Sequence, residues 1–120
     1  MAKKENRGRY RGSPRDRGYD SKWDKLSVVF RRRNPFCKWC AEQDRISLTA
    51  VVDHILPVVD RPDLKYEWSN LLPLCHHHHG TKASMEIYAR ENGLIEMLPE
   101  WCANPESRPA RCRIFTGGTG

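Results

Sequence analysis

The sequence predicts a small α+β domain whose core is held together by a bound metal ion. Residues 50–55 are apolar and β-branched, and residues 71–74 are a second short apolar run, so two strands are expected. A helical pattern follows over residues 76–92. Cysteines and histidines cluster around these elements, and only 38% of the residues are hydrophobic. A core this small usually needs a metal or disulfides to be stable.

Length and composition narrow the class of protein. The 120 residues allow one domain with tails, and the net charge of +6 favours a polyanionic partner, nucleic acid first. No apolar run approaches the length of a membrane span, and the basic N-terminus leads into no apolar segment. A cytoplasmic location is therefore expected, where five cysteines, an odd number, point to metal binding rather than to disulfides.

The chain divides into three expected parts. Residues 1–19 are rich in Lys, Arg and Gly and predict a disordered basic arm, residues 20–93 the domain, and residues 94–120 a partly flexible extension with a linker at 104–109. Within the domain, Asp20 and Ser21 offer an N-cap, and Trp23, Leu26 and Phe30 give a helical period over residues 21–32. The helix ends in three arginines that either cap it or face a phosphate backbone: Arg31, Arg32 and Arg33.

Two pairs of ligand residues predict a structural zinc site. Cys37 and Cys40 form one pair with two residues between them, and Cys75 and His78 form a second pair with the same spacing. Together they make a Cys3His set, a common type of tetrahedral zinc site. Four consecutive histidines leave an alternative in which His76, His77 or His79 replaces His78. On a helix, residues 75, 78 and 79 share a face, which favours His78 or His79 over the other two.

A second group of polar residues lies between these pairs. The first predicted strand ends in Asp53-His54-Ile55-Leu56-Pro57, and Asn70-Leu71-Leu72-Pro73-Leu74 leads into Cys75, the four histidines and Gly80-Thr81-Lys82. Together with Cys37-Lys38-Trp39-Cys40, this order resembles the zinc-containing HNH endonuclease family over about residues 20–92. Such nucleases read C-x-x-C, then D-H-I-x-P, then N-L-x-x-L-C-x-x-C-H-x-x-K. This chain departs from that pattern at His78, where the family usually has a cysteine.

The resemblance implies a ββα-metal (His-Me finger) fold with an additional N-terminal helix, and it assigns roles to individual residues. His54 would be the general base, and Asp53 and His79 would hold a catalytic Mg²⁺, Mn²⁺ or Ni²⁺. Asn70 would brace the loop between the strands or, as in some HNH subclasses, bind the metal ion. Pro57 lies close behind Asp53 and His54, so the strand is expected to end there and both side chains to reach one cleft. Ala83 stands where some relatives have a third histidine.

Two functions of different classes follow from these residues. The first is a metal-dependent endonuclease acting on double-stranded DNA, with Arg31, Arg32, Arg33 and Lys82 as candidate DNA contacts. The alternative is a non-catalytic, zinc-stabilised nucleic-acid-binding module, which has no need of Asp53, His54 and Asn70. The segment Arg17-Gly18-Tyr19-Asp20-Ser21-Lys22-Trp23 is similar to the start of small HNH proteins of bacteriophages and prophages. This resemblance implies a place beside the DNA-packaging terminase in a host cytoplasm. No pattern predicts the oligomeric state or the target sequence.

Overall fold

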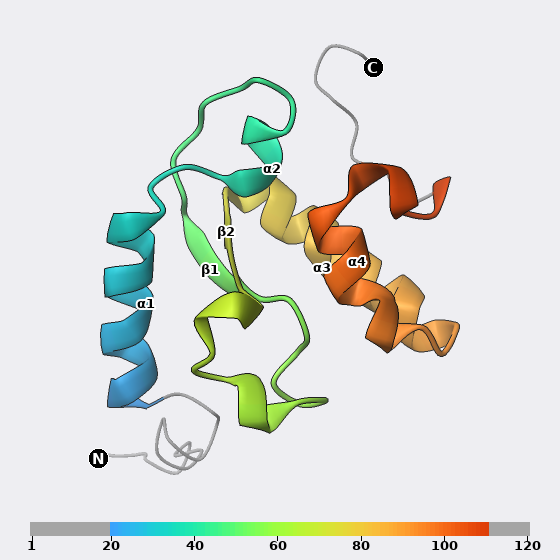
Figure 1. The fold of residues 1–120 in the computed structure, drawn as a ribbon, viewed down its shortest axis with the longest axis horizontal. Helices are drawn as coiled ribbons and strands as arrows, with labels where there is room; N and C mark the ends of the chain where they lie inside the picture. Colours follow the sequence, from blue (N-terminus) through green and yellow to red (C-terminus); the bar gives the residue numbers. More distant parts are fainter. Residues whose placement is uncertain (1–19, 111–120) are drawn as a thin grey trace, which may run out of the picture.

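The computed structural model describes residues 20–110. The expected basic arm at 1–19 and the last ten residues of the expected extension, 111–120, lie outside these residues. In chain order the helices and strands are α1, α2, β1, β2, α3 and α4, with short 3-10 turns between them (Figure 1). None of the helices described is long and apolar enough to cross a membrane.

An antiparallel hairpin forms the centre of the domain. Strand β1 (Val51–His54) pairs with β2 (Leu71–Leu74), so that Asp53 lies opposite Leu72 and His54 opposite Leu71. The first strand is shorter than the predicted 50–55, and the second matches its prediction. The connecting loop contains two 3-10 turns, Pro62–Leu64 and Trp68–Asn70. This hairpin brings the Asp-His pair and the asparagine motif to the same end of the sheet.

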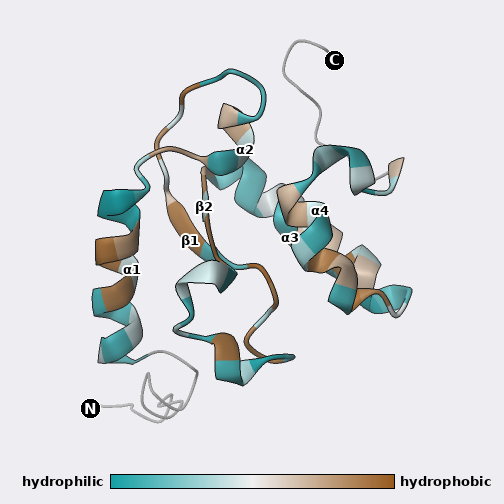
Figure 2. Ribbon diagram, viewed as in Figure 1, coloured by the Kyte–Doolittle hydropathy of each residue, from teal (hydrophilic) through white to brown (hydrophobic). Residues whose placement is uncertain are grey.

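Helix α1 (Ser21–Arg33) lies along one side of the hairpin, as Figure 1 shows. Asp20 caps it, because its carboxylate accepts a hydrogen bond from the backbone N–H of Trp23. Figure 2 shows hydrophobic residues on the middle of the helix and on β1. Phe30 is buried and packs edge-on against Trp68, with ring centroids 5.1 Å apart. The predicted amphipathic helix and its cap are confirmed, and Asn34 ends the helix.

Helix α3 (His76–Glu91) packs against both strands and covers the opposite side of the hairpin. Cys75 is its N-cap, so the histidine run forms its first turn. The core between helix and sheet contains Leu72, Leu74, Met85 and Ala89. Gly93 follows the helix with a φ of +67°, a conformation that glycine adopts without strain and other residues seldom do.

The packed core continues past residue 93, where the sequence suggested that the domain ends. Helix α4 (Leu98–Ala103) buries Leu98, Trp101 and Cys102 in the same core. The indole N–H of Trp39, from the short helix α2 (Lys38–Ala41), donates to the carbonyl of Cys102 at 3.1 Å. The segment expected to be a linker contains a 3-10 turn, Pro105–Ser107, and the buried Arg108.

The outer edge of β2 pairs with no other strand among the described residues. The N–H of Ile55 donates to the carbonyl of Asn70, the residue directly opposite it. In an antiparallel pair the hydrogen-bonded residues alternate with residues that do not bond across the pair, so the backbone groups of Leu72 and Leu74 are the ones that face β1. The backbone groups of Leu71 and Pro73 therefore turn outward. The N–H of Leu71 donates to the Trp68 carbonyl, and proline has no N–H. This edge presents carbonyl oxygens and no free donor.

Candidate metal centre and active site

Four side chains from two separate segments form one compact ligand cluster: Cys37, Cys40, Cys75 and His78, with all ligand atoms within 4.8 Å of one another. The Nδ1 atom of His78 lies 3.3, 3.5 and 3.6 Å from the sulfurs of Cys37, Cys40 and Cys75. The sulfurs of Cys40 and Cys75 are 3.8 Å apart. A tetrahedral zinc ion with Zn–S bonds of about 2.3 Å and a Zn–N bond of about 2.0 Å requires edges of about 3.8 and 3.5 Å. The cluster therefore has the dimensions of a Cys3His zinc site.

Local structure explains why these ligands converge. Cys37 and Cys75 are the N-caps of α2 and α3, and their sulfurs accept hydrogen bonds from the N–H groups of Cys40 and His78, three residues on in each case. The hydroxyl of Ser47 donates to the sulfur of Cys40 at 3.1 Å. Burial lowers the pKa of His78 to about 4, so its imidazole is neutral at pH 7 and its Nδ1 lone pair is available. These features fit a bound zinc ion.

The imidazole of His54 is held in one orientation by two contacts. Its Nε2 lies 3.0 Å from the carbonyl oxygen of Lys65, and its ring lies 4.5 Å from the ring of Trp23. Because a carbonyl only accepts, Nε2 must carry the proton and Nδ1 the lone pair. Burial, the largest effect, lowers the pKa of His54 below its usual value, although the Lys65 carbonyl and the charge of Asp53 oppose this. A neutral imidazole with one free lone pair is a competent proton acceptor.

Asn70 braces the loop that follows β1. Its side-chain oxygen accepts from the N–H of Leu56 at 2.9 Å, and its amide nitrogen donates to the Leu56 carbonyl at 3.1 Å. A longer bond of 3.5 Å reaches the Leu64 carbonyl. The side chain is buried and links the beginning and the middle of the loop to the residue that precedes β2. The backbone beside His54 is fixed as a result.

Asp53 faces helix α3 and meets a lysine there. The ammonium group of Lys82, which is fully buried, donates to Asp53 Oδ2 at 3.1 Å, to the His54 carbonyl at 2.7 Å, and to Glu86. Burial alone would lower the pKa of Lys82, but the charges of Asp53 and Glu86 outweigh it and raise the pKa. The charged lysine therefore links α3 to β1. The DNA contact expected of Lys82 does not agree with this placement, because its ammonium is not exposed.

Asp53 and His54 do not share one side of the strand, contrary to the sequence expectation. The ladder continues through His54, so successive side chains alternate, with Asp53 toward α3 and His54 toward α1. His79 is half-buried and lies one turn before Lys82 on α3, on the helix face that Asp53 meets. His76 and His77 are exposed. At the end of β1, the imidazole of His54 therefore lies on one side of the strand. The carboxylate of Asp53 lies on the other side, toward the face of α3 that carries His79.

Comparison with known proteins finds a matching family model and a similar solved structure. Residues 37–84 match the sequence profile of the HNH endonuclease family. Over these residues the chain is similar to an HNH endonuclease domain. The fold resembles the crystal structure, determined with manganese ion, of the HNH endonuclease of the deep-sea thermophilic bacteriophage GVE2, with a TM-score of 0.57 and 23% sequence identity. The similarity covers 62% of this chain and 82% of the phage protein. Comparison with curated proteins gave no match.

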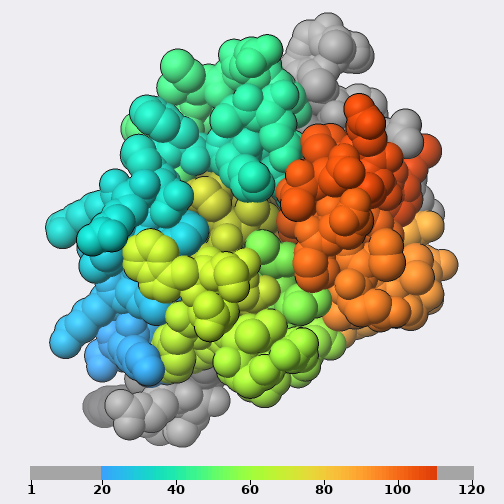
Figure 3. Space-filling view, viewed as in Figure 1, coloured from blue at the N-terminus to red at the C-terminus, as the bar shows by residue number. Residues whose placement is uncertain are grey.

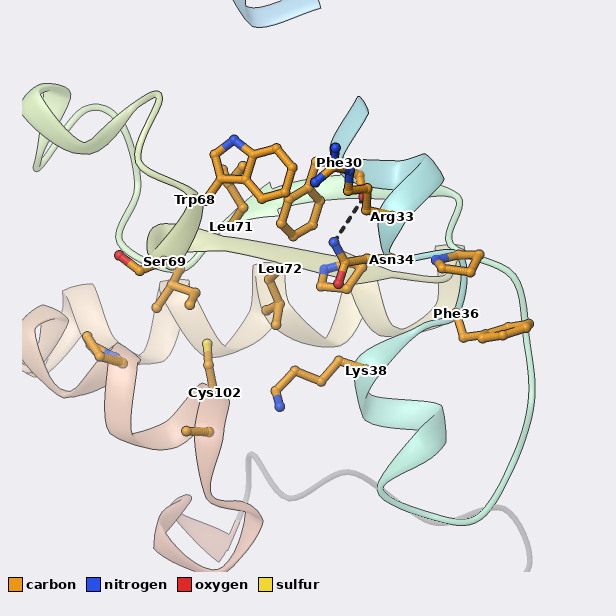
Figure 4. Close-up of a pocket in the computed structure, with 15 residues that line it drawn as sticks. Phe30, Arg33, Asn34, Phe36, Lys38, Trp68, Ser69, Leu71, Leu72 and Cys102 are labelled. Carbon is orange, nitrogen blue, oxygen red and sulfur yellow. Dashed lines mark hydrogen bonds between the residues drawn. The ribbon is translucent and has the colours of Figure 1, made fainter. Parts of the chain in front are cut away.

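The protein also has a pocket along the open edge of β2. Its volume is about 610 Å³, and α1, β2 and α4 all contribute to its lining. Figure 4 shows Trp68, Phe30 and Arg33 on one side of the strand and Lys38 and Cys102 on the other. In Figure 3 the atoms of β2 are recessed between α2, α4 and the loop before β2. Its lining includes none of Asp53, His54, Asn70 or His79, so it is distinct from the candidate active site.

The arginines at the end of α1 are exposed. Arg31, Arg32 and Arg33 occupy the last turn, where cations are also favourable toward the negative end of the helix dipole. Arg33 contributes to the lining of the pocket beside β2. Capping and phosphate contact both remain compatible with this exposed position.

Three partners of the site residues were not identified from the sequence. Lys65 acts through its backbone carbonyl, which no side-chain motif indicates. Trp23 was recognised as a helix residue, but its contact with His54 joins segments 31 residues apart. Glu86 could have been found from its spacing, because it lies four residues after Lys82 on a predicted helix and so forms a favourable pair.

Replacing Lys82 by methionine is expected to lower the free energy of unfolding by about 3 kcal/mol, the low end of the range for a broken buried ion pair. The stem of the side chain is retained, but Asp53 and Glu86 lose the cation between them. Urea denaturation monitored by circular dichroism measures the change. Lys25, exposed on α1, provides the matched control, and Lys25→Met should be nearly neutral. Equal stability of the two variants would show that the buried ammonium group of Lys82 does not stabilise the fold.

Proposed function

We propose that this chain is a metal-dependent endonuclease that hydrolyses phosphodiester bonds of double-stranded DNA. The observation that carries the proposal is the state of His54, a neutral imidazole whose protonated Nε2 is bonded to the Lys65 carbonyl, adjacent to Asp53 at the end of β1. A zinc module without catalysis needs neither this histidine nor the asparagine brace. The HNH profile match supports the same reading.

In the proposed mechanism, His54 accepts the proton of the attacking water. The scissile phosphate lies across the end of β1, where the Nδ1 lone pair of His54 can accept a proton from a water molecule on one side of the strand. Asn70 keeps the backbone after His54 in place through its bonds to Leu56. The orientation of the base is therefore set before the substrate arrives, which lowers the cost of reaching the transition state.

Asp53 and His79 are the residues proposed to hold the catalytic ion. The hydrogen bond from Lys82 uses Oδ2 of Asp53, which leaves Oδ1 as a ligand atom for a metal ion beside the face of α3 that carries His79. One carboxylate and one imidazole suit Mn²⁺, Ni²⁺ or Mg²⁺, and two protein ligands leave positions for water and phosphate oxygens. When bound, the divalent ion supplies charge stabilisation for the phosphate and the leaving oxygen.

The structural ion is proposed to be one zinc held by the Cys3His cluster, whose distances match a tetrahedral site. Arg31, Arg32 and Arg33 are proposed to contact the DNA, because their side chains are exposed. The net charge of +6 also favours binding to the phosphate backbone. Lys82 is not proposed for this role, because it is buried.

We further propose that the protein is phage-encoded, acts in the host cytoplasm and works beside the DNA-packaging terminase. The similar solved structure is that of a bacteriophage protein, which supports a phage origin. The link to packaging rests on the family resemblance of the sequence. Co-purification of the chain with the large terminase subunit from infected cells would test it.

Plasmid nicking tests the endonuclease proposal directly. Zinc-loaded protein should convert supercoiled plasmid to open circles when Mg²⁺ or Mn²⁺ is added, and should do nothing when the added ion is omitted. Binding of the plasmid without cleavage under all ions would instead favour the non-catalytic zinc module. The same plasmid in rising salt should bind progressively less protein, as phosphate contacts predict.

The histidine run allows the two metal sites to be separated by mutation. His79→Ala should lose nicking activity yet keep zinc and its melting temperature, whereas His78→Ala should lose zinc and melt at a lower temperature. His76→Ala and His77→Ala are the matched controls, because both side chains are exposed, and neither property should change. His78→Cys should preserve zinc, fold and cleavage, since thiolate also binds zinc. Zinc loss in His79→Ala with a folded, inactive His78→Ala would reverse the two assignments.

A further inference from the structure

Helix α1 lies outside the matched HNH segment, yet it contacts the proposed base. The HNH match begins at residue 37, and α1 ends at residue 33. Trp23, on its first turn, places its indole 4.5 Å from the imidazole of His54, with the two rings tilted by 32°. A flat aromatic surface at this distance limits rotation of the imidazole and shields one of its faces from water.

The carboxylate of Asp20 connects this helix to the other contact of His54. Its Oδ1 accepts from the N–H of Trp23 at 2.6 Å. Its Oδ2 accepts from the ammonium of Lys65 at 3.1 Å and from the hydroxyl of Tyr66. Lys65 and Tyr66 flank a single peptide group, and the carbonyl of that peptide is the one that bonds His54 Nε2.

One carboxylate therefore fixes both groups that contact the imidazole. We propose that Asp20 and Trp23 are positioning residues for His54: Asp20 holds the Lys65–Tyr66 peptide and the Trp23 backbone, and together they keep the imidazole in one orientation with Nε2 protonated. The role of His54 as a base rests on the proposed function. Neither Asp20 nor Trp23 touches the reacting atoms, so both act through His54.

The arrangement contains more than an N-cap requires. A cap needs only the bond to the Trp23 N–H, which a serine also makes. The bonds from Lys65 and Tyr66 come from residues more than 40 positions away and use the second oxygen of the same carboxylate. Asp20→Ser therefore separates the two roles, because serine can cap α1 but offers a single short hydroxyl in place of the second oxygen.

Imidazole nitrogen NMR on zinc-loaded, full-length protein without added divalent ion tests the proposal. In the wild type, His54 should show a single tautomer with the proton on Nε2, assigned by its loss in His54→Gln. In Asp20→Ser and Trp23→Leu the signals should shift toward a mixture of tautomers. In nicking assays with Mn²⁺ both variants should lose about tenfold or more in kcat with little change in KM, as misplacement of a reacting group predicts. Trp23→Phe, which keeps a flat ring, should restore most of the activity.

Phe30→Leu is the matched control, since it weakens the packing of α1 against Trp68 without contacting His54. It should lower the melting temperature but leave the tautomer and kcat unchanged. Unchanged tautomer and kcat in both Asp20→Ser and Trp23→Leu would overturn the proposal. If the wild type cleaves no DNA while Asp20→Ser still alters the tautomer, the positioning contacts stand and the endonuclease assignment fails.

Discussion

Replacing His54 by alanine is expected to abolish DNA cleavage while the protein stays folded and still binds DNA. Burial lowers the pKa of His54, so the imidazole is neutral at pH 7 and able to accept a proton. General base catalysis typically contributes a factor of about 10² to 10⁴ in rate, and alanine removes it entirely. The zinc cluster and the arginines of α1 include no atom of His54, which is why zinc content and DNA binding should persist.

The measurement is the initial rate of plasmid nicking in Mn²⁺, with gel-shift binding and the melting temperature recorded on the same samples. His76→Ala is a suitable control, because it removes an exposed imidazole from the same protein. Cleavage well above background by folded His54→Ala protein would show that another group is the base.

Cys40→Ser is expected to unfold the domain. Zinc binding contributes about 10–16 kcal/mol in small zinc modules, whereas a whole domain of this size is stable by only about 5–15 kcal/mol. The thiolate of Cys40 lies within 4 Å of two other ligand atoms, and a serine hydroxyl is a poor zinc ligand. Elemental analysis should find about one zinc per chain in the wild type and much less in the variant.

Cys102→Ala is the matched control for this experiment. Cys102 is buried in the core in the last turn of α4 and belongs to no ligand cluster among residues 20–110. Its replacement should retain the zinc and lower stability modestly, by about 1 kcal/mol for a small loss of buried volume. A Cys40→Ser protein with a cooperative thermal melt like that of the wild type would show that the fold does not depend on zinc.

The parts of this structure that are encoded locally could be read from the sequence. The cap at Asp20, the strand at residues 71–74, and the helix from His76 each depend on neighbouring residues, and the structure has all three. The Cys3His set was also predicted, because two pairs with equal spacing leave few ways to complete a tetrahedron. Here local pattern and tertiary structure agree.

Features that depend on distant partners could not be read in this way. Residues 104–109 contain two prolines and polar residues and resemble a linker, yet Arg108 is buried. Its guanidinium lies 4.6 Å from the ring centre of Trp39 and donates to the Cys102 carbonyl, contacts that exist only once α2 and α4 are packed together. The burial of Lys82 has the same origin, because a lysine on a helix is exposed unless a carboxylate such as Asp53 faces it.

The proline in β2 has a consequence for the behaviour of the protein at high concentration. A two-stranded sheet has exposed edges, and an edge with free N–H and C=O groups can recruit the strand of another molecule into an aggregate. At the outer edge of β2, Pro73 has no N–H group, and the N–H group of Leu71 already donates to the carbonyl of Trp68. A second copy approaching this edge would find acceptors without donors, so an alternating ladder could not grow. The four residues of β2 therefore limit strand addition at this edge of the hairpin.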